Sequence, residues 1–280
     1  MLRGRMTDQT APLPDPTDLA AVRAALDELD DALHALLRRR AAIVAELAAS
    51  RSKSGPPLRA GREAAILRRL LANHSGPLPP AFLVRIWREI LASSLAQQGG
   101  FTLSVQGDAA EAAARLQFGP LTPLRRHESP ARALADVTSG EAAAAVLPAA
   151  GSEAEDDPAW WTVLDPPRLF VVARLPLLPE PGAAPADVVT TVAPDPSGAD
   201  RSLIRAEVPP GASRAAIAAG FASAGLPAAE LQVRRDAGRA FALAEVPGFL
   251  RPEEPRLARL PYPRAVLLGA FAEPLTPPRP

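Results

Sequence analysis

Three arginines occupy widely spaced positions in one segment, residues 19–52, that contains neither proline nor glycine. Each residue of an α-helix turns by about 100°, so Arg40 and Arg51, eleven residues apart, lie within about 20° of each other on one face. These two side chains can therefore serve one pocket. Arg23 lies about 25 Å from Arg40 along such a helix and about 100° round it. It cannot join that pocket from the same helix, but it could enter the pocket of an antiparallel partner chain.

Four further polar residues accompany these arginines on the next two expected helices. Arg62 and Glu63 open one helix, and Ser94 and Gln98 share a face of the other because they stand at i and i+4. Taken alone, each arginine fits a solvated surface residue, because the chain is rich in arginine: Lys53 is the only lysine among 31 basic residues. Together, the set supplies several guanidinium groups, one carboxylate and two neutral polar groups, which favours a site.

The elements that must position these residues are helical. Asp15 and Pro16 read as an N-cap and a first helical turn, and apolar residues then recur every three or four positions up to "SGPP" at 54–57. This pattern predicts one helix of roughly 35 residues, about 50 Å long, which a small domain cannot cover alone. We therefore expect a partner chain to pack along it. Residues 62–74 and 80–98 predict a second and a third helix.

The rest of the chain alternates strands and helices. Short strands and two helices over residues 101–194 predict a small α/β unit with a partly parallel sheet. From residue 201 the expected order is βαββαβ, with a last helix over 252–260, which describes a ferredoxin-like module. The expected fold class is multidomain α + α/β: a tail (1–15), a helical domain (16–99), an α/β lobe with a Pro-rich connection (100–198) and the ferredoxin-like module (199–280).

The composition argues against several kinds of chemistry and partner. The formal net charge is zero, so no global charge draws the chain to nucleic acid or to an anionic membrane surface. There is no cysteine and there are only three histidines, which makes a metal site or a Cys nucleophile unexpected. No apolar run matches a membrane span or a signal peptide, so we expect a cytoplasmic protein that works without metal or cofactor.

The order and spacing of the helical motifs resemble the all-helical class of chorismate mutases, in particular the mutase domain that begins the bifunctional mutase–prephenate dehydratases. The resemblance covers Thr17 to about Gly99 and rests on "AVRAALDELDDALHALLRRR", "REAAILRRL" and "RIWREILASSLAQQ". It implies a homodimer in which Arg23 enters the partner's site. The other implied site residues serve their own chain: Arg40, Arg51, Arg62, Glu63, Ser94 and Gln98.

Two positions depart from the pattern of this family. Arg51 stands where the family usually has Lys, and Ala60 or Gly61 stands where it often has Asp. Lys53 cannot substitute for the family lysine, because it lies about 220° round the helix from Arg40. Arg51 is therefore the expected counterpart. Without the Asp, Glu63 alone would contact the ring hydroxyl of the substrate.

The implied reaction is the intramolecular Claisen-type rearrangement of chorismate to prephenate, an isomerisation that needs no nucleophile, metal or obligatory base. Arg23 of the partner and Arg40 would bind the two carboxylates by forked hydrogen bonds, and Ser94 would help to hold one of them. Arg51 and Gln98 would meet the negative charge that grows on the breaking ether oxygen. The catalytic residues would thus be Arg51, Gln98 and Glu63.

The order of the later modules also resembles the mutase–dehydratases, whose last module is a regulatory ACT domain. However, the dehydratase signature Thr-Arg-Phe is absent, and residues 149–151 read Ala-Ala-Gly where that family carries an Asn-bearing motif. These departures imply a dehydratase-like remnant without dehydratase activity. "LPYPRAVLLGAFAEPL" resembles the closing strand of an ACT domain, and an aromatic amino acid is a conceivable effector there.

Three classes of function stay open at this point. The first is a chorismate mutase with a degenerate C-terminal region, which the polar set on the helices favours. The second is a non-catalytic regulator of aromatic amino-acid biosynthesis that has kept an unused mutase pocket. The third, an amino-acid sensor, rests on the last module alone. Loss of chorismate in the presence of the purified protein separates the first class from the other two.

Overall fold

The structure is a computed structural model that describes residues 14–50, 55–151, 159–236 and 238–276. The described residues form two compact units, one made of residues up to 50 and the other of residues from 55 onward. The boundary falls inside the predicted helical domain. Each unit is described below by itself.

The first unit is the long helix α1, Leu19–Ser50, of 32 residues. Its N-terminus is capped by Asp18, whose Oδ1 accepts hydrogen bonds from the backbone N–H groups of Ala20 and Ala21. The sequence placed this cap at Asp15, which was wrong: Asp15 instead accepts from Thr17 in the turn before the helix. None of the residues of α1 is buried, although its apolar residues recur at helical spacing.

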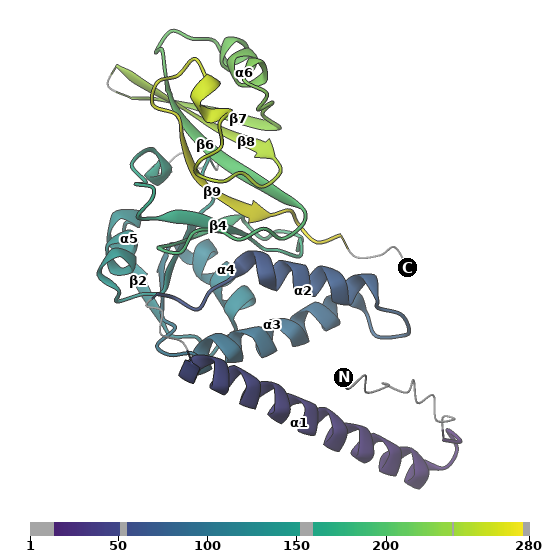
Figure 1. The fold of residues 1–280 in the computed structure, drawn as a ribbon. Helices are drawn as coiled ribbons and strands as arrows, with labels where there is room; N and C mark the ends of the chain where they lie inside the picture. The colour runs from purple at the N-terminus through teal and green to yellow at the C-terminus, as the bar shows by residue number, and fades with distance from the viewer. Residues whose placement is uncertain (1–13, 51–54, 152–158, 237, 277–280) are drawn as a thin grey trace. The chain divides into compact units, whose positions relative to one another are not determined.

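The second unit begins with two helices and continues with a large sheet (Figure 1). Helix α2 spans Ala60–Ala72 and α3 spans Pro80–Gln97, as the sequence predicts to within two residues. The later helices are α4 (Asp108–Phe118), α5 (Pro130–Ser139) and α6 (Arg214–Ser223), with 3₁₀ turns η1 (Trp160–Thr162) and η2 (Leu257–Arg259). The strands are β1 (Leu103–Gln106), β2 (Leu124–His127), β3 (Ala144–Pro148), β4 (Phe170–Leu175), β5 (Ala186–Thr190), β6 (Asp200–Val208), β7 (Glu230–Asp236), β8 (Arg239–Pro247) and β9 (Val266–Ala272).

One predicted helix does not form. Residues 252–260 were expected to be the second helix of the ferredoxin-like module, but only η2 is found there. Pro255 lies in the middle of the segment and Pro261 directly follows it. A proline inside a helix removes a backbone donor and clashes with the preceding turn, so the segment is limited to a short turn.

All nine strands belong to a single sheet, in the order β2-β1-β3-β5-β4-β9-β6-β8-β7. β1 is parallel to β2 and β3, which confirms the partly parallel sheet of the α/β lobe. The lobe and the ferredoxin-like module meet where β4 pairs with β9 in parallel. In this pairing Val171 lies opposite Gly269. A Cβ on Gly269 would lie 1.9 Å from the Val171 carbonyl oxygen, so this junction requires glycine.

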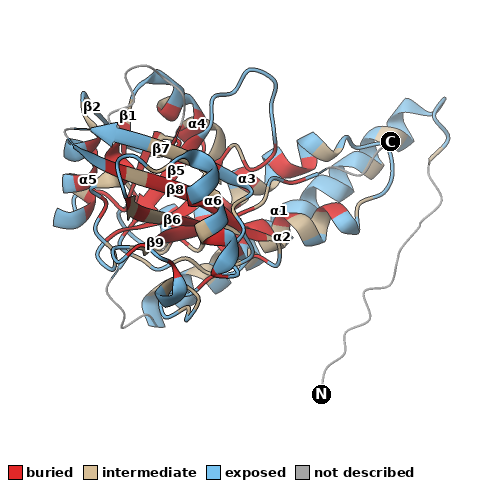
Figure 2. Cartoon of the chain, turned by 90° about the horizontal axis from the view of Figure 1, so that it is seen from above, coloured by how far each residue is buried: buried red, intermediate tan, exposed pale blue. Residues whose placement is uncertain are grey.

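The sheet is packed on both faces, and its strands are mostly buried (Figure 2). Val172 of β4 and Val188 of β5 pack with α4 on one face, whereas their neighbours Val171 and Val189 pack with α5 on the other. This alternation is the expected pattern for strands covered by helices on both faces. In the ferredoxin-like module, α6 covers one face of β6 and β8.

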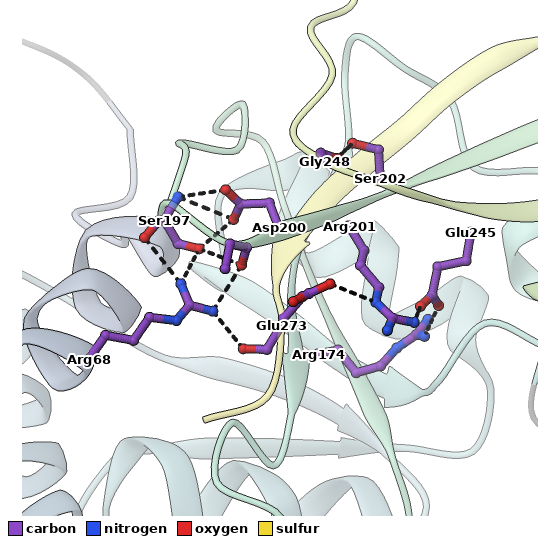
Figure 3. Close-up of polar contacts among 10 residues, drawn as sticks. Arg68, Arg174, Ser197, Asp200, Arg201, Ser202, Glu245, Gly248 and Glu273 are labelled. Carbon is purple, nitrogen blue, oxygen red and sulfur yellow. Dashed lines mark hydrogen bonds and ion pairs between the residues drawn. The ribbon is translucent and has the colours of Figure 1, made fainter. Parts of the chain in front are cut away.

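Buried ion pairs join the two parts of the sheet near the β4–β9 junction (Figure 3). Arg174 of β4 donates to Asp187 of β5 at 2.8 Å and to Glu245 of β8 at 2.6 Å. Glu245 also accepts from Arg201 of β6 at 2.7 Å. Burial lowers the pKa of Arg174, but the charges and hydrogen bonds of the two carboxylates outweigh this and raise its pKa above the ordinary value. These contacts tie the lobe and the module into one body.

Candidate functional site

The predicted site residues are divided between the two units. Arg23 is exposed and Arg40 is half-buried on α1, and burial lowers the pKa of the Arg40 guanidinium. Arg51 lies outside the described residues. Arg62, Glu63, Ser94 and Gln98 belong to the second unit, on α2 and α3.

Ser94 and Gln98 lie together near the C-terminal end of α3, as their i, i+4 spacing predicts. The Ser94 hydroxyl donates to the Ile90 carbonyl at 2.7 Å, and Gln98 Nε2 donates to the Ser94 carbonyl at 2.9 Å. Both side chains are therefore fixed by the last turns of their own helix. A glutamine amide has two N–H donors and one carbonyl, so this contact leaves one N–H of Gln98 for another acceptor.

Gln98 lines a surface groove of about 480 Å³. The groove lies between the end of α3, the segment before α2, and the turn that joins α5 to β3. Its lining is neutral: residues 55–57, 98–100, 137–140, 142, 143 and 191. A glutamine that caps a helix therefore borders a space large enough for a small molecule.

Arg62 and Glu63 are neighbours on α2 but face different surroundings. Arg62 is exposed, and its side chain makes no ion pair with any residue that the structure describes. Glu63 is only 9% exposed and points toward the sheet. The two side chains can face different surroundings because consecutive residues of a helix lie about 100° apart. The structure therefore places the arginine on the free side of α2 and the carboxyl group on its packed side.

Glu63 lines a small cavity between α2, the end of α4 and strand β4. The cavity measures about 20 Å³, which is room for about one water molecule. Arg174 and Gln117 also line it, and Gln117 Oε1 is buried without a hydrogen-bond partner among the described residues. Burial, followed by the negative charge of Asp195, raises the pKa of Glu63 to about 8. The carboxyl group is therefore mostly protonated at neutral pH.

The N-terminus of α2 is capped by a residue far away in the sequence. The N-cap residue, Arg59, makes no side-chain capping bond. Instead, Asp195 Oδ1 accepts from the backbone N–H of Gly61 at 3.1 Å, and Oδ2 accepts from that of Arg62 at 2.8 Å. A Cβ on Gly61 would lie 2.0 Å from the Asp195 carbonyl oxygen, so the backbones of α2 and the β5–β6 loop are in direct contact.

A second contact between α2 and the C-terminal half is made by Arg68 (Figure 3). Its guanidinium donates to the carbonyl and hydroxyl oxygens of Ser197, at 3.1 and 2.6 Å, and to the carbonyls of Ala199 and Glu273, at 2.8 and 2.7 Å. Neither Asp195 nor Arg68 is predicted from the sequence. Their partners lie 129 to 205 positions away, and no local pattern marks such a contact.

The residues that the structure describes contain no group of three or more His, Asp or Glu side chains placed to hold a metal ion. None of the helices that the structure describes has the length and apolar character needed to cross a membrane.

The helical part of the chain that carries the predicted site residues resembles a known protein family. Residues 22–99 match the family model "Chorismate mutase type II", and this range contains every predicted site residue from Arg23 to Gln98. A curated relative, the bifunctional chorismate mutase/prephenate dehydratase of Stutzerimonas stutzeri, is 30% identical over 116 residues. That alignment covers 38% of this chain and 32% of the relative, so the chain spans about a third of the length of the relative it matches.

Solved structures resemble the larger part of the chain. GqqA, described as a novel type of quorum quenching acylase, is 21% identical, with a TM-score of 0.50 over 65% of this chain and all of that one. The prephenate dehydratase of Arthrobacter aurescens in complex with L-Phe is 17% identical, with a TM-score of 0.46 over 62% of this chain and 92% of that one. At such identities the likeness to GqqA concerns the fold alone.

Proposed function

Because residues 22–99 match the chorismate mutase type II family model, we propose that this chain is an isomerase that converts chorismate to prephenate. The observation that carries the proposal is the match of residues 22–99 to this family model, a range that contains Arg23, Arg40 and Gln98. The reaction is intramolecular, so positioning and electrostatic stabilisation suffice. The chain offers arginines, a carboxyl group, a hydroxyl and an amide for these tasks.

We assign binding of the two substrate carboxylates to arginines. Arg40 of one chain and Arg23 of its partner each present a planar fork of donors that matches a carboxylate. Arg62 adds a third guanidinium from the exposed side of α2. The Ser94 hydroxyl is assigned to one carboxylate, which requires its single O–H to turn away from the Ile90 carbonyl. Held at both ends, the substrate is restricted to the folded shape in which its enolpyruvyl group lies over the ring.

Arg51 and Gln98 act on the breaking bond. Negative charge develops on the ether oxygen as its bond to the ring breaks, and a cation with an N–H donor stabilises that charge more in the transition state than in the substrate. Arg51 supplies the cation, and Gln98 supplies the amide N–H that is not used by Ser94. Glu63 is assigned to the ring hydroxyl, which requires its side chain to turn out of the cavity under α2.

The proposed active form is a homodimer with shared sites. Arg23 and Arg40 are seventeen positions apart on a continuous helix, about 25 Å, so both reach one substrate only if they come from different chains. The apolar side chains of α1 provide the surface for a second copy, since Leu29 and Leu36 are 61% and 63% exposed. We place the reaction in the cytoplasm.

We further propose that the chain lacks prephenate dehydratase activity. Ala150 occupies the turn after β3, where the dehydratase-like pattern calls for an Asn-bearing motif, and its N–H donates to the buried Asp187 at 2.8 Å. This turn therefore consists of small residues engaged in structural contacts. An aromatic amino acid is a second possible ligand, at the ACT-like module.

Purified protein should consume chorismate and accumulate prephenate, measured by the loss of chorismate absorbance and by chromatography of the products. Arg40→Ala should abolish most of this activity, whereas Arg38→Ala, an exposed arginine about 200° away on the same helix, should not. Phenylpyruvate formed at neutral pH would contradict the second half of the proposal. An unchanged chorismate signal with wild-type protein would contradict the first.

A further inference from the structure

The first turn of α2 depends on the β5–β6 loop for its hydrogen bonds. The first four N–H groups of any helix lack partners within the helix, and the N-cap residue of α2, Arg59, makes no side-chain capping bond to them. The Asp195 carboxylate takes two of them, those of Gly61 and Arg62, with one oxygen each. Because a carboxylate at this end also meets the positive end of the helix dipole, it is favoured over a neutral cap.

We propose that Asp195 is a positioning residue for Arg62 in the mutase reaction, so that the β5–β6 loop is a working part of the mutase site. This inference rests on the proposed function. It gives the C-terminal half of the chain a role in catalysis that does not need dehydratase chemistry or an effector: it holds the helix that presents a substrate-binding arginine.

The loop is rigid enough to act as such a support. The Asp200 carboxylate accepts from the backbone N–H of Ser197 at 3.1 and 2.9 Å and from that of Gly198 at 3.2 Å. Arg68 then fixes Ser197 and Ala199 to the middle of α2. Two anchors therefore hold α2 to one loop, Asp195 at its first turn and Arg68 two turns further on.

The contact is also close enough to transmit small displacements. The Asp195 carbonyl oxygen lies 2.0 Å from the position that a Cβ of Gly61 would take, so the two backbones touch without an intervening side chain. Arg62 follows directly, with its N–H bonded to Oδ2 of the same aspartate. A shift of Asp195 therefore moves the backbone from which the Arg62 side chain extends. The charge of Asp195 also acts on Glu63, the next residue, by raising its pKa.

Asp195→Ala in the full-length chain tests this role. Removing the cap frees the first turn of α2, and a misplaced guanidinium weakens carboxylate binding in the substrate and in the transition state alike, which raises KM and leaves kcat nearly unchanged. We expect a rise in KM of about tenfold. Ser213→Ala is the matched control, because Ser213 caps α6 by accepting from Ala216 at 3.1 Å, far along the chain from α2. It should lower the melting temperature slightly and leave KM as in the wild type.

A double variant separates positioning from a general loss of stability. If Asp195 acts on KM through Arg62, the KM of Arg62→Ala/Asp195→Ala should equal that of Arg62→Ala alone, because the guanidinium that Asp195 positions is absent. Multiplied effects in the double variant, or an unchanged KM for Asp195→Ala in an active enzyme, would overturn the inference and leave the proposed function standing. A wild-type protein without mutase activity would overturn both.

Discussion

Helices α1 and α2 both fall within the family match at residues 22–99, yet they are stabilised in different ways. α1 has 32 residues and buries none of them, whereas α2 has 13 residues and buries five: Gly61, Glu63, Ala64, Leu67 and Leu71. The short helix is held by Asp195 and Arg68 contacts to the C-terminal half. The long helix presents a continuous row of exposed leucines instead.

This difference indicates what each helix requires. An isolated helix gains little stability from propensity alone, so an amphipathic helix depends on packing of its apolar face. We infer that α1 obtains that packing from a second copy, while α2 obtains it within its own chain. The proposed mutase site would then depend on two interfaces, one between chains and one between α2 and the sheet, and each can be disturbed separately.

The largest effect is expected at the interface between chains. Arg23→Ala and Arg40→Ala should each lose mutase activity by roughly a hundredfold or more, since each removes a charged contact to substrate. After the two inactive variants are mixed and allowed to exchange subunits, heterodimers contain one site that lacks neither arginine. Part of the activity should therefore return, measured by chorismate consumption. Subunit exchange without any recovery would show that the sites are not shared.

Gly61→Ala tests the contact between α2 and the sheet by the sign of its effect. In an undocked helix, Ala is more favourable than Gly by about 1 kcal/mol. In the docked helix its Cβ would lie 2.0 Å from a backbone oxygen of Asp195 that cannot easily move, so we expect a loss of about 1–3 kcal/mol of unfolding free energy. Gly211→Ala is the control, because no atom lies within 4 Å of its Cβ position. Stabilisation by Gly61→Ala in denaturant titrations would contradict the docking.

The last effect concerns the pH dependence of stability. Glu63 is buried beside Asp195 and Arg174, and its pKa is raised to about 8 from an ordinary value of 4.5. The folded state then holds a proton that the unfolded state has released, so the contribution of Glu63 to stability is fully present below pH 4.5 and is lost as pH rises toward 8.

Glu63→Gln should remove this part of the pH dependence, because the amide keeps the shape and carries no titratable proton. Unfolding free energies measured between pH 5 and pH 8 should fall less in the variant than in the wild type. Glu89→Gln, at an exposed position on α3, should follow the wild-type curve. Parallel curves for Glu63→Gln and wild type would show that the carboxyl group is already ionised in the folded protein.

The sequence predicts the helices of the mutase segment well because their signals are local. Apolar spacing, Pro79–Pro80 and Gly99–Gly100 mark α2 and α3 to within two residues. The helix expected at 252–260 does not form, because Pro255 interrupts the segment and only η2 is found there. The cap at Asp15 failed by a small margin, because Asp18 offers the same chemistry three residues later.

Contacts between distant segments could not be predicted in this way. Arg62 and Glu63 read as a pair of site residues, but whether each faces solvent or the sheet depends on which side of α2 is docked. That docking is set by Asp195, Arg68 and Gly61, whose partners are more than a hundred positions away. The joining of lobe and module into one sheet likewise involves residues far apart in the sequence: the close approach of Val171 to Gly269 and the contact of Arg174 with Glu245.

The most direct measurement of the central claim is the fate of chorismate with full-length wild-type protein, followed by proton NMR at neutral pH. We predict conversion to prephenate far faster than the uncatalysed rearrangement, with no phenylpyruvate, and near-complete loss of that acceleration in Arg40→Ala. Chorismate that disappears no faster than in buffer, or equally fast with Arg40→Ala, would contradict it.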